Sequence, residues 1–180
     1  MKRLSLKATS LILALVLALS LSVTAFADNS DSSLTRAEVT QEVIKNMGLT
    51  AQAETSAKDA SAFKDVAEGS KFEGAINLAY SKGIVNGVSE TRFAPDDPIT
   101  REQLAAILYR YDTYRGHTPQ GSTALDGYAD AASVESWAAE AMSWANGNGL
   151  VTGVTPTTLV PNGTATRAQV AVILSRYTDQ

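Results

Sequence analysis

The sequence predicts a mainly α-helical protein built from repeated helix–loop–helix units. Residues 63–111 and 128–177 align with each other at an offset of 65 or 66 positions. Each segment contains an alanine-rich stretch, a glycine-bounded loop and a second stretch with apolar residues at helical spacing. A match sustained in one register indicates a true internal repeat, which determines the fold class.

The first helix of each unit is rich in alanine. One copy carries Phe72, Ala75, Ile76 and Ala79, and the other carries Trp137, Ala141 and Trp144. The loops that follow are GIVNGV at 83–88 and GLVTGV at 149–154. Gly83 and Gly149 stand where a helix end needs a left-handed residue.

The second helix of each unit begins with a capping box. Its apolar positions are Leu104, Ile107, Leu108 and Tyr111 in one copy, and Val170, Ile173, Leu174 and Tyr177 in the other. The pattern T-x-x-E/Q comes three times, as Thr35–Glu38, Thr100–Gln103 and Thr166–Gln169. Threonine and the acid or amide three residues later satisfy the first backbone N–H groups of a helix.

A third copy is incomplete, because LTRAEVTQEVIKNMGL at 34–49 matches only the second half of the unit. We therefore expect a half unit at 28–50, a linker at 51–58, and full repeats at 59–121 and 122–180. The missing first half would lie upstream, where residues 1–27 resemble a signal peptide. A basic start is followed there by an apolar run and by Ala25-Phe26-Ala27, a typical cleavage pattern.

Composition points to an exported, acidic chain. Without residues 1–27 it keeps 12 basic and 19 acidic residues, a formal charge of −7. Such a charge disfavours nucleic acid and, after signal removal, an anionic membrane as partners. The absence of cysteine excludes disulfides, so a packed core must supply the stability.

Three arginines occupy a position that helix electrostatics disfavours. Arg36, Arg101 and Arg167 each fall in the first helical turn, where a cation costs about 0.3–1 kcal/mol when exposed. One hypothesis is that each guanidinium faces an anion beside free backbone N–H groups. The alternatives are pairing with a nearby acid, such as Asp96, Asp97 or Glu102, and simple copying by duplication.

The combination F-x-D-V, W-A-x-x-A, G-I-V-N-G-V, F-x-P and I-T-R-E-Q resembles the S-layer homology (SLH) domain of bacterial surface proteins, over residues 34–177. The resemblance implies a pseudo-threefold helical bundle, incomplete here, with grooves between units. It also implies non-covalent attachment to an anionic cell-wall polysaccharide, often one with pyruvylated amino sugars. The expected location is the cell wall or cell surface of a secreted protein.

The resemblance also implies the glycan-binding residues. Arg36, Arg101 and Arg167 would contact the acidic group, and Trp137 the sugar, with Phe72 at the matching place in the other unit. The backbone at Gly83, Gly87, Gly149 and Gly153 would approach the sugar. Alternatives stay open: Trp137 and Trp144 as core residues, and the glycines as conformational residues. Arg36, in the half unit, is expected to lack a complete site, and Asp65 and Asp130 to cap the turns that follow them.

The sequence contains few residues that could support an enzymatic function. His117, the single histidine, lies in a turn-rich linker, and no zinc-ligand set or catalytic triad can be assembled. The glycines at 147–153 do not match the dinucleotide fingerprint. We therefore predict no enzyme, no metal and no cofactor. Two functions remain: a module that binds a cell-wall glycan, or an envelope assembly subunit whose half repeat a protein partner completes.

Overall fold

Short helices and connecting loops make up the computed structural model, which describes residues 31–56 and 61–179. The elements are α3 (Arg36–Asn46), α4 (Thr50–Ser56), α5 (Glu73–Ser81), α6 (Arg101–Tyr114), the 3₁₀ turn η1 (Ala131–Ser133), α7 (Ala139–Gly147) and α8 (Arg167–Thr178). The described residues form no β-strand, only isolated bridges. The predicted mainly α class is confirmed.

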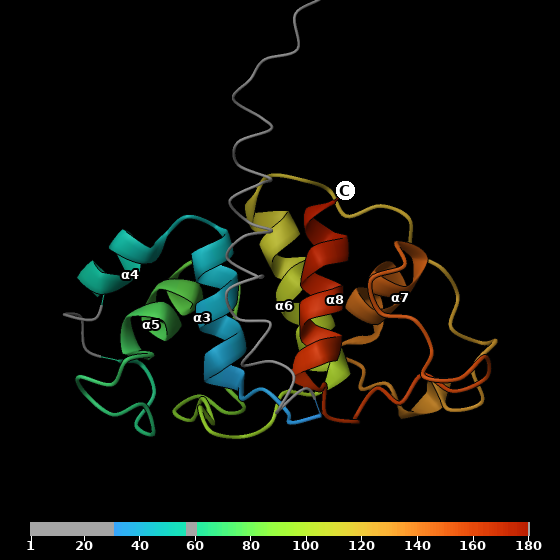
Figure 1. The fold of residues 1–180 in the computed structure, drawn as a ribbon, viewed down its shortest axis with the longest axis horizontal. Helices are drawn as coiled ribbons and strands as arrows, with labels where there is room; N and C mark the ends of the chain where they lie inside the picture. The colour runs from blue at the N-terminus through green and yellow to red at the C-terminus, as the bar shows by residue number, and fades with distance from the viewer. Residues whose placement is uncertain (1–30, 57–60, 180) are drawn as a thin grey trace, which may run out of the picture. The chain divides into compact units, whose positions relative to one another are not determined.

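The second helices of the three units, α3, α6 and α8, begin around a common ring. The segment before α3 bridges the segment before α6 through Thr35 and Pro98. The segment before α6 bridges the one before α8 through Thr100 and Thr164, and Thr166 closes the ring on Ser33. In Figure 1 these three helices stand in the middle of the bundle, with α4 and α5 on one side and α7 on the other. The arrangement is the predicted pseudo-threefold one.

All three ring helices begin with the capping box that the sequence predicts. Thr35, Thr100 and Thr166 each accept a hydrogen bond from the backbone N–H three residues later, and the side chain of that later residue accepts from the threonine N–H. Glutamine performs the return contact in α6 and α8 as glutamate does in α3. These caps fix where each helix starts and therefore where the following arginine lies.

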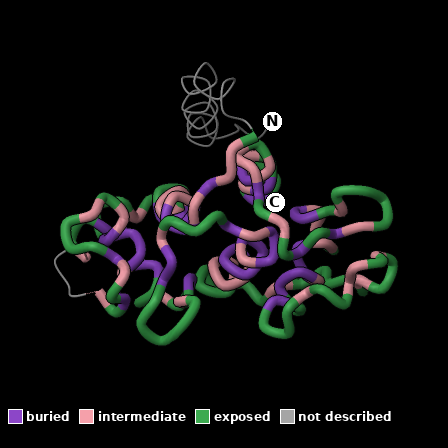
Figure 2. Tube along the Cα trace, turned by 90° about the horizontal axis from the view of Figure 1, so that it is seen from below, coloured by how far each residue is buried: buried purple, intermediate pink, exposed green. Residues whose placement is uncertain are grey.

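One hydrophobic core runs through the units. Its largest fully buried side chains include Phe93, Ile44, Ile76, Leu104, Leu108, Met142 and Leu150. Small residues let the helices approach closely, since Ala37, Ala79, Ala105 and Ala145 are at most 1% exposed. Figure 2 shows the buried segments on the inner sides of the helices, with the exposed ones in the outer loops.

The segment predicted as a linker at 51–58 is helical in the part that the structure describes. Thr50–Ser56 forms α4, which packs against α5. Ala53 buries its methyl group, and the Nδ2 of Asn77 in α5 donates to the Ser56 carbonyl at 3.2 Å. Small polar residues suggested flexibility, but burial of a single alanine and this long-range hydrogen bond hold the segment helical.

The predicted signal peptide at 1–27 lies outside the described residues. Among residues 31–56 and 61–179, no helix has the length and apolar character needed to cross a membrane.

Candidate functional site

Arg36 and Arg101 are buried and bind loop carbonyls of the next unit. The Nε of Arg36 donates to the Phe93 carbonyl at 2.9 Å, and its Nη2 donates to the Asn86 carbonyl at 3.0 Å. The Nε of Arg101 likewise donates to Leu159, at 3.0 Å, and its Nη2 donates to Thr152. The exposed fractions of the two arginines are 6% and 5%. Each guanidinium therefore ties the start of one unit's helix to the loop of the following unit.

The helix N-termini beside these arginines are also occupied. The backbone N–H groups of Arg36 and Ala37 donate to the carbonyls of Asp97 and Pro95. At α6, the N–H groups of Arg101 and Glu102 donate to the carbonyls of Gly163 and Pro161. The hypothesis that a guanidinium and free N–H groups together face an anion is therefore wrong at α3 and α6.

These carbonyls explain why arginine is tolerated in the first turn. Burial lowers the pKa of Arg36 and of Arg101, but a guanidinium is not deprotonated in proteins at neutral pH, so both stay charged. Charge-assisted hydrogen bonds to carbonyls offset its desolvation. Arg36 gains a further contact, because its guanidinium carbon lies 4.7 Å from the ring centroid of Phe93.

Asp65 and Asp130 hold the same loops from the other side. The two carboxylate oxygens of Asp65 accept from the N–H groups of Phe93 and Ala94, at 2.8 and 2.7 Å. Asp130 accepts from Leu159 and Val160, both at 2.7 Å. The expectation that these aspartates cap the turns after them is wrong, because each reaches about 30 residues along the chain.

Each pair of hydrogen bonds stabilises a strained residue. Ala94 and Val160 have φ angles of 60° and 54°, a left-handed conformation that costs an L-residue about 1–2 kcal/mol. For the β-branched Val160 this conformation is especially unusual. Chelation of the adjacent N–H groups by one carboxylate keeps the loop in this shape, with the carbonyl before the strained residue directed at the buried arginine.

The four predicted glycines divide into two kinds. Gly83 and Gly149 have φ angles of 68° and 67° and open space where a Cβ would be, so they end α5 and α7 for conformational reasons. A Cβ on Gly87 would lie 2.3 Å from the Ser89 carbonyl oxygen, and one on Gly153 would lie 2.3 Å from that of Thr155. The second pair is therefore required by close packing.

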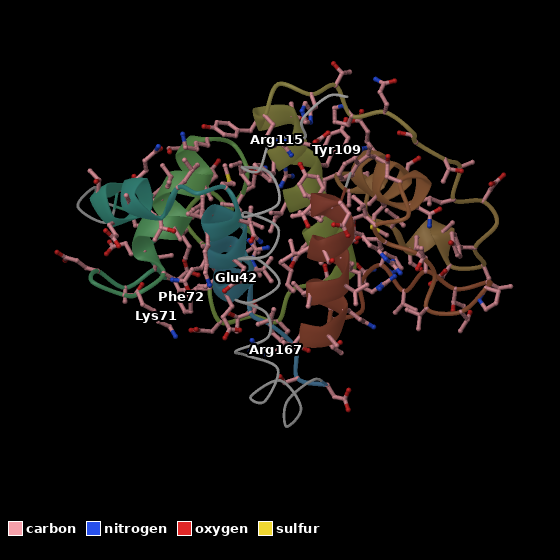
Figure 3. The ribbon with its side chains drawn as sticks, turned by 45° about the horizontal axis from the view of Figure 1, so that its top comes forward. Glu42, Lys71, Phe72, Tyr109, Arg115 and Arg167 are labelled. Atoms are coloured by element: carbon pink, nitrogen blue, oxygen red, sulfur yellow. The ribbon has the colours of Figure 1, made fainter. Side chains whose placement is uncertain are left out.

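Arg167, the third repeat arginine, has different surroundings. Its Nη2 lies 3.7 Å from Oε1 of Glu38, and its side chain is 30% exposed. No described residue offers Arg167 loop carbonyls like those that Arg36 and Arg101 bind. Figure 3 places Arg167 at the lower end of α8, away from Tyr109 and Arg115 on α6. Pairing with an acid thus applies to Arg167, although the acid is Glu38 rather than Asp96, Asp97 or Glu102.

A pocket of about 240 Å³ lies between the units. It is lined by Arg36, Val85, Asn86, Gly87, Val88, Gln103, Ala106, Ile107, Arg110 and Trp137. Three predicted residues, Arg36, Gly87 and Trp137, thus come together although 101 positions separate the first from the last. The sequence predicts no complete site around Arg36; in the structure, the first repeat and Trp137 of the second supply walls of the pocket that Arg36 lines.

The two tryptophans have different roles. Trp144 is 3% exposed and packs edge-to-face against Tyr109 and Tyr177, so the core alternative is correct for it. Trp137 is 49% exposed and lines the pocket, so the core alternative is wrong for it. An exposed indole beside polar backbone and arginine is a surface on which a sugar ring can stack.

Lys71, and not Phe72, occupies the place of Trp137 in the first repeat. Trp137 precedes α7 by two residues, and Lys71 precedes α5 by two residues. The offset changes from 65 to 66 between Asp130 and α7, so one extra residue displaces the match. Lys71 and Phe72 lie beside α3 in Figure 3, where the Lys71 ammonium is 4.6 Å from the Phe72 ring centroid.

The sequence analysis missed Gln103 and Arg110 as pocket residues. They share one face of α6 with Ala106 and Ile107, at helical spacing. The repeat itself contained a signal for Arg110, because Lys45 and Arg176 occupy the same position in the other two units. A basic residue at this position in all three units is the same kind of signal as the arginine in the first turn of each second helix.

The described residues hold no group of three or more histidine, aspartate or glutamate side chains that could bind a metal ion. His117 is half exposed, and its Nδ1 lies 2.8 Å from Oδ1 of Asp112, away from the pocket-lining residues. The pocket lining combines the indole of Trp137 with two cations, Arg36 and Arg110.

Comparison with known families and proteins agrees with this geometry. The family model described as the S-layer homology domain matches residues 62–105 and 127–171. A further model, of a domain of unknown function (DUF4148), matches residues 1–46. The two stretches of the first match lie within the two predicted full repeats.

Similar proteins include surface proteins and enzymes. A surface-layer 125 kDa protein of Lysinibacillus sphaericus is 37% identical over 63% of this chain, and a cell surface protein of Thermoanaerobacter kivui is 32% identical over 81%. Exoglucanase XynX of Acetivibrio thermocellus is 30% identical over 79% of the chain. The chain spans only 10%, 16% and 12% of the length of these three relatives. The likeness supports a module that associates with the cell surface.

Proposed function

The chain belongs to the S-layer homology family, and on that premise we propose that it binds an anionic cell-wall polysaccharide non-covalently through the pocket between α6 and Trp137. Binding there would attach a secreted protein to the cell wall. We further propose that the repeats are non-catalytic, because the enzymes among the relatives match over only 7–14% of their length.

The observation that carries the proposal is the convergence of three units on one pocket. The half unit supplies Arg36, the first repeat supplies α6 and the loop at 85–88, and the second repeat supplies Trp137. Ligand sites are typically concave and mostly apolar, with a few polar groups that fix orientation. The half-exposed indole offers a stacking surface, and the loop offers backbone groups to sugar hydroxyls.

Sedimentation with purified sacculi tests this function. The wild-type chain should pellet with sacculi that carry their secondary polymer and remain in the supernatant with stripped sacculi. Trp137→Ala should weaken the binding about 5- to 150-fold, since stacking and hydrogen-bonded contacts of this kind contribute roughly 1–3 kcal/mol. Tyr114→Ala is the matched control, because Tyr114 is an aromatic side chain of similar exposure, 43%, outside the pocket. Equal pelleting of stripped and intact sacculi would refute the proposal.

A second candidate function is assembly with a protein partner. The observation that favours it is Arg167, which no described residue provides with loop carbonyls of the kind bound by Arg36 and Arg101. A partner that supplies a matching loop would displace Glu38 from Arg167. Sedimentation velocity of the chain alone and with isolated envelope proteins distinguishes this function, because Arg167→Ala should abolish any complex while leaving binding to sacculi unchanged.

A further inference from the structure

The pocket is positively charged in an acidic protein. The chain has 19 acidic and 15 basic residues, yet the described residues lining the pocket include Arg36 and Arg110 and no carboxylate. Burial is the main cause that lowers the pKa of Arg36; the charge of Asp97 acts to raise it, and the charge of Arg110 acts to lower it. Two cations line the pocket and no carboxylate belongs to its lining, which favours an anionic occupant.

Arg110 is the cation without a protein partner. Its side chain is half-buried on α6, and it makes no hydrogen bond or ion pair with any residue in 31–56 or 61–179. Desolvation lowers its pKa. A partly desolvated guanidinium without an acceptor loses hydration and gains nothing from the protein in return. A ligand acceptor in the pocket would restore this interaction.

The other two repeats show that this position is usually paired. Lys45, its counterpart in the half unit, lies 3.8 Å from Oε1 of Glu42. Arg176, the counterpart in the second repeat, donates from Nη1 to the carbonyls of Gly149 and Leu150, at 3.1 and 3.4 Å. In the first repeat the cation lines the pocket described above, and the described residues leave its donors unused.

Arg36 is poorly placed to serve as the main anion contact. Its Nε–H and one Nη2–H are committed to the carbonyls of Phe93 and Asn86, and the residue is only 6% exposed, so few of its donors can reach a ligand. We propose that Arg110 is the specificity-determining residue of the pocket and selects a sugar that bears an acidic group, while Trp137 packs against the sugar ring. This inference rests on the proposed glycan-binding function and concerns a carboxylate or phosphate carried by the glycan.

Calorimetry with three disaccharides of N-acetylated amino sugars tests the inference. One carries a pyruvate ketal, one carries a phosphate monoester in its place, and one is neutral. The wild-type chain should bind an acidic disaccharide about 10- to 100-fold more tightly than the neutral one, the range expected for hydrogen bonds to a charged group. The two acidic probes identify which acid the pocket prefers.

Arg110→Gln should reduce binding of the preferred acidic disaccharide to the level of the neutral one, whereas Arg110→Lys should keep part of the preference. Arg176→Gln is the matched control at the same repeat position and should bind as the wild type does. Thermal melting of all variants checks that each is folded. Arg110→Gln removes no hydrogen bond or ion pair with a described residue, so the melting temperature of this variant should stay close to that of the wild type.

The outcomes separate the inference from the function on which it rests. If Arg110→Gln keeps the full preference for the acid, or if the wild type binds all three disaccharides equally, the role of Arg110 is refuted and glycan binding stands. If Trp137→Ala and wild type both fail to bind any disaccharide and both fail to pellet with intact sacculi, the proposed function fails as well.

Discussion

Arg36 and Phe93 make two contacts, one through the peptide and one through the ring. The Nε of Arg36 donates to the Phe93 carbonyl at 2.9 Å, and its guanidinium carbon lies 4.7 Å from the ring centroid. Phe93 in turn donates its N–H to Asp65. One residue of the loop thus connects a cation of the preceding unit with an anion of its own unit, and this connection shapes one wall of the pocket.

The buried arginines should contribute far more to stability than the exposed one. Arg101→Ala leaves the carbonyls of Leu159 and Thr152 without their donor and opens a cavity, so it should lower the free energy of unfolding by about 2–4 kcal/mol. Arg167→Ala removes a partly exposed ion pair and should cost less than about 1 kcal/mol. Urea denaturation of both variants measures the difference. Equal losses would show that Arg101 does not clamp adjoining units.

Two glycines separated by four positions should respond differently to a methyl group. Gly83→Ala must keep a φ of 68° but meets no atom, so it should cost about 1–2 kcal/mol. Gly87→Ala would place a Cβ 2.3 Å from the Ser89 oxygen and 2.5 Å from the Phe63 ring, and should cost more than about 3 kcal/mol. Thermal and urea unfolding of the pair compares the two effects. A milder effect at Gly87 than at Gly83 would contradict the packing described here.

Acid should destabilise the loop through Asp65. Burial acts to raise the pKa of this carboxyl, but the hydrogen bonds from Phe93 and Ala94 outweigh it, and the net pKa lies below the ordinary value. A depressed carboxyl pKa stabilises the folded state above the unfolded-state pKa of about 3.9, and this contribution is lost as the pH falls through the folded value. The melting temperature of the wild type should therefore decline steeply below about pH 4.

Asp65→Asn should be less stable at pH 7 and should show a shallower decline in acid. Asp126→Asn provides the control, because Asp126 is exposed and its side chain makes no hydrogen bond with the described residues; its curve should follow that of the wild type. A steep acid decline that survives in Asp65→Asn would indicate that other carboxylates are responsible.

Local signals in the sequence predicted most of the fold. Capping at Thr35, Thr100 and Thr166 depends on residues three positions apart, and the left-handed ends at Gly83 and Gly149 depend on one residue each. Such features are determined by neighbouring residues, so they can be read without a structure. The alignment of the repeats then predicted that the three second helices are equivalent, as the ring of bridges confirms.

The site was harder to predict because its contacts cross units. The carbonyl partners of Arg36 lie 50 and 57 residues away, and no sequence pattern marks a backbone oxygen as an acceptor. Asp65 was assigned a local cap for the same reason. A single inserted residue before α7 was enough to pair Trp137 with Phe72 instead of Lys71. Arg110 was overlooked because its repeated position looks like an ordinary solvated helix face.

A chain of this kind should bind one glycan end per molecule. Around Arg101 and the loop at 152–154, no described residue stands in the place of Trp137, and Arg176 is bonded to loop carbonyls. Around Arg167, Glu38 neutralises the arginine and Lys71 stands where Trp137 would be. Titration with an acidic disaccharide should therefore give a stoichiometry near one. In Trp144→Phe the remaining indole of Trp137 should report the same single event by fluorescence. A second equivalent bound with similar affinity, and still bound by Trp137→Ala, would show that a cleft without the tryptophan wall is also functional.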